Sequence, residues 1–99
     1  MIRGTTPLLE FVIPFDTSLL AEAFVTLAQN GVVVLEKRLE ECQCAAKKLS
    51  VRLTQEETLK LKYSIITEIQ IRAKTVSGEV VASNIFRERT DRILKDGVI

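Results

Sequence analysis

The chain contains no histidine and no tryptophan, and only four glycines and two prolines. Without histidine, Ser-His-Asp and Cys-His catalytic groups and histidine-bound metals are excluded. No Walker A loop, G-x-G-x-x-G loop or G-x-S-x-G motif occurs either. We therefore expect no catalytic residue, no cofactor and no metal site, and we predict that the protein is not an enzyme.

Cysteine is scarce as well, since Cys42 and Cys44 are the only two and a single residue separates them. A disulfide across one residue would be strained. A zinc site needs about four ligands, and histidine is not there to supply any. The spacing therefore predicts two reduced thiols in or beside the core, with pairing or metal sharing between subunits as the alternative.

Long hydrophobic runs and an excess of one charge are also missing. No apolar run reaches the ~18 residues that cross a bilayer, and Met1 to Pro7 lacks the apolar core of a signal peptide. Fourteen basic and thirteen acidic residues leave a net charge of +1. Such a balance creates no strong attraction to nucleic acid or to an anionic membrane. We expect a cytoplasmic protein that binds neither.

What the chain does have is a large apolar share for its size. It has 99 residues, which predicts one domain spanning 1–99. Hydrophobic residues make up 46% of it. A domain this small has room for one modest core, so we expect part of its apolar surface to be buried against a partner.

Alternating apolar and polar residues point to an all-β fold. Strands are predicted at 9–15, 49–53 and 65–75, the last followed by a second strand at about 79–90. The segment 65–75 has one apolar face and one polar face, as in a half-buried antiparallel sheet, and 9–15 has at least one apolar face. Six or seven short strands at this spacing predict an antiparallel β-sandwich.

Two segments fit a helix as well as a strand. The apolar residues of 19–28 have helical spacing, but Asn30-Gly31 between two apolar runs favours a hairpin with strands at about 22–28 and 32–38. Residues 36–47 show the same conflict, without any glycine or proline. We predict strands in both, and the alternative is an α+β fold with helices at about 18–29, at 36–47, or at both.

One short helical turn is predicted near 54–61. Thr54 and Glu57 have the spacing of a capping box, in which each side chain bonds the backbone N–H of the other residue. A helix of this length is not stable alone. It is expected to connect strands at one end of the sandwich.

The clusters of charged residues do not indicate a catalytic or nucleic-acid-binding site. Glu40-Glu41 and Glu56-Glu57 are adjacent acidic pairs, and neighbours on a strand point to opposite faces. Arg87, Arg89 and Arg92 form the densest basic group, but Glu88, Asp91 and Asp96 dilute it. We interpret the basic group as a solvated strand end, and we expect no glycosidase-type pair among the carboxylates.

The C-terminal tail, residues 90–99, has no periodicity but is rich in apolar side chains. These residues need a surface to cover, either on the same domain or on a neighbour. The predicted protein-interface residues are Ile93, Leu94, Val98 and Ile99.

Six stretches of the chain have a recognisable composition: Arg3–Pro7, Ile13–Leu19, Ala28–Gly31, Leu53–Thr58, Glu68–Arg72 and Arg92–Ile99. Together they resemble a group of small phage and prophage proteins from Gram-positive, often gut, bacteria. More distantly, the chain is similar to the immunoglobulin-like N-terminal domains of phage baseplate upper proteins. The resemblance implies an immunoglobulin-like sandwich that acts in tail or virion assembly, and it transfers no functional residues.

We therefore expect a homo-oligomer that contacts itself and other virion proteins. Family members often have an Asp-Gly turn near 45–46, where this chain has Ala45-Ala46. This departure weakens the strand prediction for 36–47. The alternative function is a β-sandwich module that binds carbohydrate or another ligand.

Overall fold

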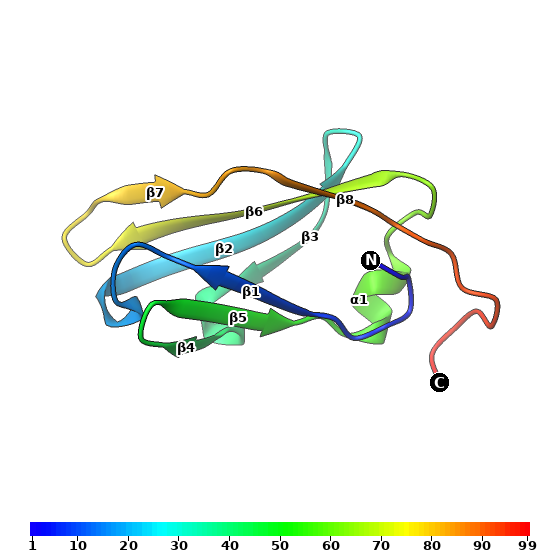
Figure 1. Ribbon diagram of the computed structural model, residues 1–99, viewed down its shortest axis with the longest axis horizontal. Helices are drawn as coiled ribbons and strands as arrows, with labels where there is room; N and C mark the ends of the chain where they lie inside the picture. The colour runs from blue at the N-terminus through cyan, green and yellow to red at the C-terminus, as the bar shows by residue number, and fades with distance from the viewer.

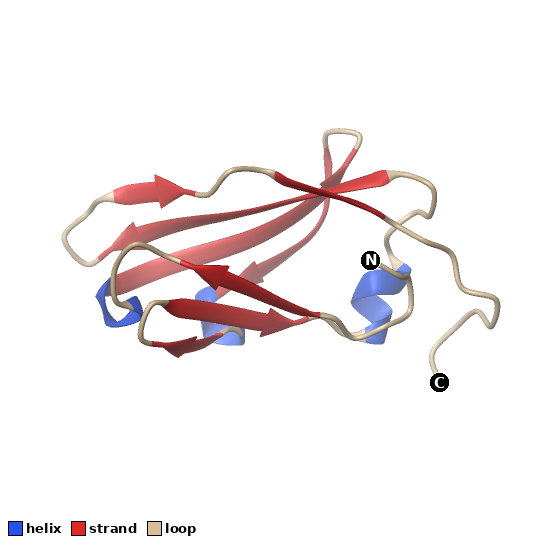
Figure 2. Ribbon diagram, in the orientation of Figure 1, coloured by secondary structure: helices blue, strands red, loops and turns tan.

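The computed structural model describes residues 1–99. Eight strands, one α-helix and two 3-10 helices make up the regular structure (Figures 1 and 2). In chain order they are β1 (Leu8–Val12), η1 (Thr17–Leu19), β2 (Leu20–Gln29), β3 (Val32–Arg38), η2 (Leu39–Glu41), β4 (Gln43–Ala45), β5 (Lys48–Arg52), α1 (Gln55–Leu59), β6 (Ile66–Thr75), β7 (Val80–Ala82) and β8 (Phe86–Arg89).

The strands form two antiparallel sheets that pack together, which confirms the predicted β-sandwich. The smaller sheet has the order β1-β5-β4. The larger has the order β3-β2-β6-β7, and β8 pairs with β6 beyond the end of β7. Five strands therefore have one unpaired side within a sheet of the sandwich: β1 and β4 in the small sheet, and β3, β7 and β8 in the large one.

The segment 18–29, which fitted a helix as well as a strand, forms strand β2 of the β2–β3 hairpin. Gln29 pairs with Val32, which leaves Asn30 and Gly31 as a two-residue loop. Both have positive φ, +51° and +75°, as a type I′ turn requires. This turn favours the hairpin because its twist matches that of the strands. The alternative prediction of a helix at 18–29 is wrong.

The alternative helix at 36–47 is also wrong. This segment contains the end of β3, then η2, then β4, which turns back to pair with β5. Ala45 pairs with Lys48, so the loop consists of Ala46 and Lys47. Ala46 has a φ of +51°, and its carbonyl accepts hydrogen bonds from the N–H and the hydroxyl of Thr17, at 2.7 and 2.8 Å. A tertiary contact therefore holds a residue that is poorly suited to this turn.

Replacing Ala46 with glycine is expected to stabilise the protein by about 1 kcal/mol, because the left-handed region costs an L-residue about that much. Ala45→Gly, one position earlier in β4, is the matched control and should destabilise by roughly 0.5–1 kcal/mol. Urea unfolding of the two variants and the parent chain measures both changes. Equal effects of the two substitutions would show that Ala46 is not strained.

The predicted capping box is present at the start of α1. The backbone N–H of Glu57 donates to the Thr54 hydroxyl at 3.2 Å, and the N–H of Thr54 donates to the Glu57 carboxylate at 2.9 Å. The helix ends after five residues, and Leu61 behind it is buried. As predicted, α1 is a connector, and it leads from β5 to β6 at one end of the sandwich (Figure 1).

The predicted strand at 65–75 is β6, and the predicted strand at 79–90 is two strands. Along β6, Thr67, Ile69, Ile71, Ala73 and Thr75 are buried and the residues between them are not. Opposite β6 the chain pairs as β7, leaves the sheet at residues 83–85, and pairs again as β8. The polar run Ser83-Asn84 falls in this break, where the Ser83 hydroxyl accepts from the Ile71 N–H.

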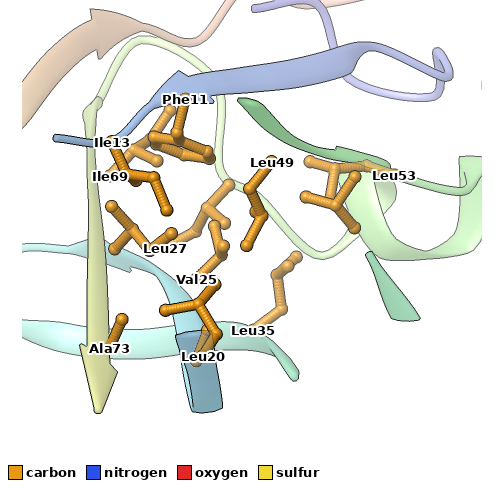
Figure 3. Close-up of a cluster of buried hydrophobic side chains, with 13 residues drawn as sticks. Phe11, Ile13, Leu20, Val25, Leu27, Leu35, Leu49, Leu53, Ile69 and Ala73 are labelled. Atoms are coloured by element: carbon orange, nitrogen blue, oxygen red, sulfur yellow. The ribbon is translucent and has the colours of Figure 1, made fainter. Parts of the chain in front are cut away.

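The core lies between the two sheets and draws on both (Figure 3). Val25, Leu27, Leu49 and Leu53 have no exposed surface. Thirteen buried apolar residues form a single cluster, in keeping with one domain built around one core. On one side of the sandwich, η2 connects β3 of the large sheet to β4 of the small sheet, and Lys37 of β3 is buried. Residues of β1 and β7, the edge strands on the other side, line a groove.

Candidate functional site

A groove of about 520 Å³ lies between the two sheets on the side formed by β1 and β7. Its floor is the inner face of β6, at Ile71 and Ala73, and its walls are β1 and the segment from Val81 to Phe86. In Figure 1, β7 lies at the upper edge and β1 in the lower half, with β6 and β2 drawn between them. We call this side, with the groove and the unpaired edge of β1, the open side.

The groove is almost entirely apolar. Eight of its eleven lining residues are hydrophobic. Phe11 and Phe86 face each other across it, with ring centroids 6.3 Å apart and planes tilted by 53°, a favourable aromatic geometry. Phe11 is 7% exposed whereas Phe86 is 52% exposed, so one ring closes the core and the other remains in solvent.

Charge is nearly absent from the groove. Glu10 is the one ionised side chain in its lining. It lies on the outer face of the small sheet and pairs with Lys48 at 3.3 Å. A surface with so little charge suits an apolar partner, because no ionised group must be stripped of water on contact.

The edge of β1 presents free backbone groups along the groove. Ile13 donates its N–H to Lys47 at 2.9 Å, and Pro7 accepts from Leu53 at 3.0 Å, both towards β5. Because alternate residues of a strand point their backbone groups to opposite sides, Leu9 and Phe11 also face β5. The N–H and C=O groups of Leu8, Glu10 and Val12 therefore point away from the sheet.

The edge of β3, in contrast, is protected by a buried lysine. Lys37 points inward and is 7% exposed, and its ammonium lies 2.7 Å from the Glu57 carboxylate and 3.7 Å from that of Glu41. An inward charge on an edge strand opposes pairing with another chain. The β4 edge is limited in another way, because this strand has only three residues.

The two charges of this ion pair shift each other's ionisation. Burial on its own would lower the pKa of Lys37, but the hydrogen bond and charge of Glu57, with Glu41, outweigh it and raise the pKa. Burial would likewise raise the pKa of Glu57, but the hydrogen bonds from Lys37 and Thr54 lower it. Both groups are therefore held in their charged forms.

The predicted interface residues of the tail fall into two groups. Ile93 lies against the domain itself, since a Cβ on Gly4 would approach its Cδ1 to 2.8 Å. Leu94, Val98 and Ile99 are exposed, at 93%, 53% and 89%. The tail thus carries apolar side chains that the domain does not cover, and their role in an interface stays a prediction.

Polar contacts hold the tail beside α1. The Gln55 side chain bonds both backbone groups of Ile99, donating to the carbonyl at 3.0 Å and accepting from the N–H at 2.8 Å. Asp96 lies 3.6 Å from the guanidinium of Arg3, which also donates to the carbonyls of Leu59 and Leu61. The first two residues of the predicted tail belong to the domain, because Thr90 is buried and hydrogen-bonded to Thr67 and Asp91 bonds the backbone of Met1 and Arg3.

Both cysteines are free thiols, as predicted, though only one lies beside the core. Cys42 is partly buried against the core and donates to the Arg38 carbonyl at 3.3 Å, while Cys44 is exposed on β4. Burial raises the pKa of Cys42 to about 11. Because the thiolate is the reactive form, this thiol is a poor nucleophile at neutral pH.

The charged clusters identified in the sequence do not form a site together. Glu41 and Glu57 both lie near Lys37, one from each acidic pair. Arg87 pairs with Glu68 at 3.2 Å and Arg89 with Asp91 at 3.7 Å, so acidic neighbours offset the basic group. No group of three or more potential metal ligands is present. None of the helices has the length and hydropathy needed to cross a bilayer.

The groove itself was missed in the sequence, where Phe86 and Val81 were assigned to one continuous strand. The polar break at Ser83-Asn84 was the available signal, because it interrupts the alternation of that strand. Comparison with known proteins adds no assignment, since no family model, no curated protein and no solved structure matches the chain.

Proposed function

We propose that this chain is a non-enzymatic structural or assembly module that acts through protein–protein contacts. The observation that carries the proposal is the open side, where a mostly apolar groove adjoins a strand edge with free backbone groups. Free edges are normally blocked in proteins that stay monomeric. Here Lys37 blocks β3, whereas no buried charge blocks β1.

The resemblance to small phage and prophage proteins supplies the setting of the proposal. In that setting the chain is made in the bacterial cytoplasm and enters a tail or baseplate assembly, with copies of itself and other virion proteins as partners. The exposed side chains of Leu94, Val98 and Ile99 give the tail a second contact element, away from the groove.

A carbohydrate-binding module is the competing function, and the chemistry of the groove fits it less well. Sugar hydroxyls need hydrogen-bonding partners when they leave water. The polar side chains of the groove already have partners: Glu10 pairs with Lys48, and the Ser83 hydroxyl bonds the Ile71 N–H and the Asn84 carbonyl. We expect no binding on a glycan array.

The test is made in a host that carries the gene within its prophage. Deleting the gene is expected to stop the production of infectious particles, and the wild-type gene supplied in trans should restore it. A gene carrying Phe86→Glu, which places a charge in the groove, should not restore it, whereas Val32→Glu on the protected β3 edge should. Normal particle yield without the gene, with the protein missing from particles and their precursors, would refute the proposal.

A further inference from the structure

We propose that the open side is closed by a second copy of this chain, with β1 pairing antiparallel to β1 of that copy across a two-fold axis. This inference rests on the proposed function and specifies its partner and its mode of contact. The pairing would join two three-stranded sheets into one six-stranded sheet and cover both grooves. Two-fold symmetric dimers are the commonest oligomers, and in them the same surface of each subunit forms the interface.

Charge is the first argument for a second copy. A two-fold interface places each surface against itself, so a patch with net charge of one sign repels its own copy. The groove satisfies this condition, since its single ionised residue, Glu10, is neutralised by Lys48. The remaining lining is apolar or uncharged and can meet a copy of itself without repulsion.

The direction of the backbone groups sets the register. Only residues whose N–H and C=O point outward can bond across the new edge, and on β1 these include Glu10 and Val12. A register centred on Phe11 places Glu10 opposite Val12 of the second copy and forms four backbone hydrogen bonds. It also keeps the two Glu10 carboxylates out of direct opposition, where like charges destabilise a pair.

The size of the open side fits a dimer interface. The strands run along the long axis of a molecule that measures 46 × 27 × 16 Å between Cα extremes (Figure 1). A face spanned by the long and the short axis measures about 740 Å² with the loops and the tail included, which is the same order as the ~800 Å² per partner of a stable interface. The apolar groove and the half-exposed Phe86 lie on this side, and they supply the fully desolvated centre that such interfaces need.

The register predicts a response that depends on the sign of a charge at position 12. Val12 is 81% exposed, so substitutions there leave the fold of the subunit intact. In Val12→Glu, the new carboxylate faces Glu10 of the second copy twice per dimer. In Val12→Lys, the ammonium faces the same carboxylate and attracts it. Val32→Glu, on the protected β3 edge, is the matched control.

The experiment is sedimentation equilibrium of the full-length chain and these three variants over a range of concentrations. We expect a reversible dimer whose dissociation constant rises about tenfold or more in Val12→Glu, and is unchanged or lower in Val12→Lys and unchanged in Val32→Glu. Circular dichroism confirms that each variant is folded.

Two results would overturn the inference. If the wild-type chain forms an oligomer that Val12→Glu leaves intact, the self-contact does not involve β1. The proposed function, assembly through protein–protein contacts, would not be contradicted by this result. A wild-type chain that stays monomeric up to about 500 μM, between the micromolar and millimolar ranges of affinity, would exclude the dimer. The particle-yield experiment then decides the proposed function separately, because it does not depend on which protein fills the groove.

Discussion

Replacing Leu49 with alanine is expected to remove about 2–5 kcal/mol of stability, the usual cost of a buried Leu→Ala change. Leu49 has no exposed surface and points from β5, the central strand of the small sheet, into the shared core (Figure 3). The total free energy of unfolding of a small domain is about 5–15 kcal/mol. The variant should therefore unfold at a much lower urea concentration, or be partly unfolded in buffer.

Val76→Ala is the control for this loss. Val76 lies in the turn between β6 and β7 and is 68% exposed, so its truncation should change the free energy of unfolding by no more than about 0.5 kcal/mol. If Leu49→Ala cost as little as Val76→Ala, the two sheets would not share the core described above.

Replacing Glu57 with glutamine is expected to cost about 1–3 kcal/mol near neutral pH, because the change removes the charged partner of the nearly buried Lys37. The pKa of Glu57 is lowered on folding from its ordinary value of 4.5. Its stabilising effect is therefore complete above about pH 4.5 and is lost as the pH falls through the lowered folded value. The difference between the two proteins should shrink in acid.

Urea unfolding across the acid range measures this difference, and Glu56→Gln provides the matched control. Glu56 is the exposed neighbour of Glu57 in α1 and forms no ion pair. Its substitution should have a small effect at every pH. A stability difference for Glu57→Gln that does not vary with pH would mean that the Lys37–Glu57 pair contributes nothing through charge.

Local signals predicted much of the fold correctly. Alternation located β5 and β6, the Thr54 and Glu57 spacing located α1, and Asn30-Gly31 located the turn of the β2–β3 hairpin. These features depend on residues close together in the chain, so the sequence shows them directly. The ambiguity at 36–47 had a different cause, because a hydrogen bond from the distant Thr17 supports the turn at Ala46.

The candidate site could not be predicted in the same way. The groove joins β1 with residues far along the chain, from Ile71 to Phe86, and Phe11 contacts the most distant of them. Lys37 appeared to be an ordinary surface lysine, because its partners Glu41 and Glu57 are placed by η2 and by α1. Which strand edges are free follows from the strand order, and no local pattern encodes that order.

The most direct test of the central claim, that the open side is the contact surface, is amide hydrogen exchange measured residue by residue with NMR. At low concentration, the amides of Glu10 and Val12 should exchange rapidly while those of Leu9 and Phe11, bonded to β5, exchange slowly. At high concentration, Glu10 and Val12 should become protected in the wild-type chain and stay unprotected in Val12→Glu. Rapid exchange of Glu10 and Val12 at every concentration would contradict the account.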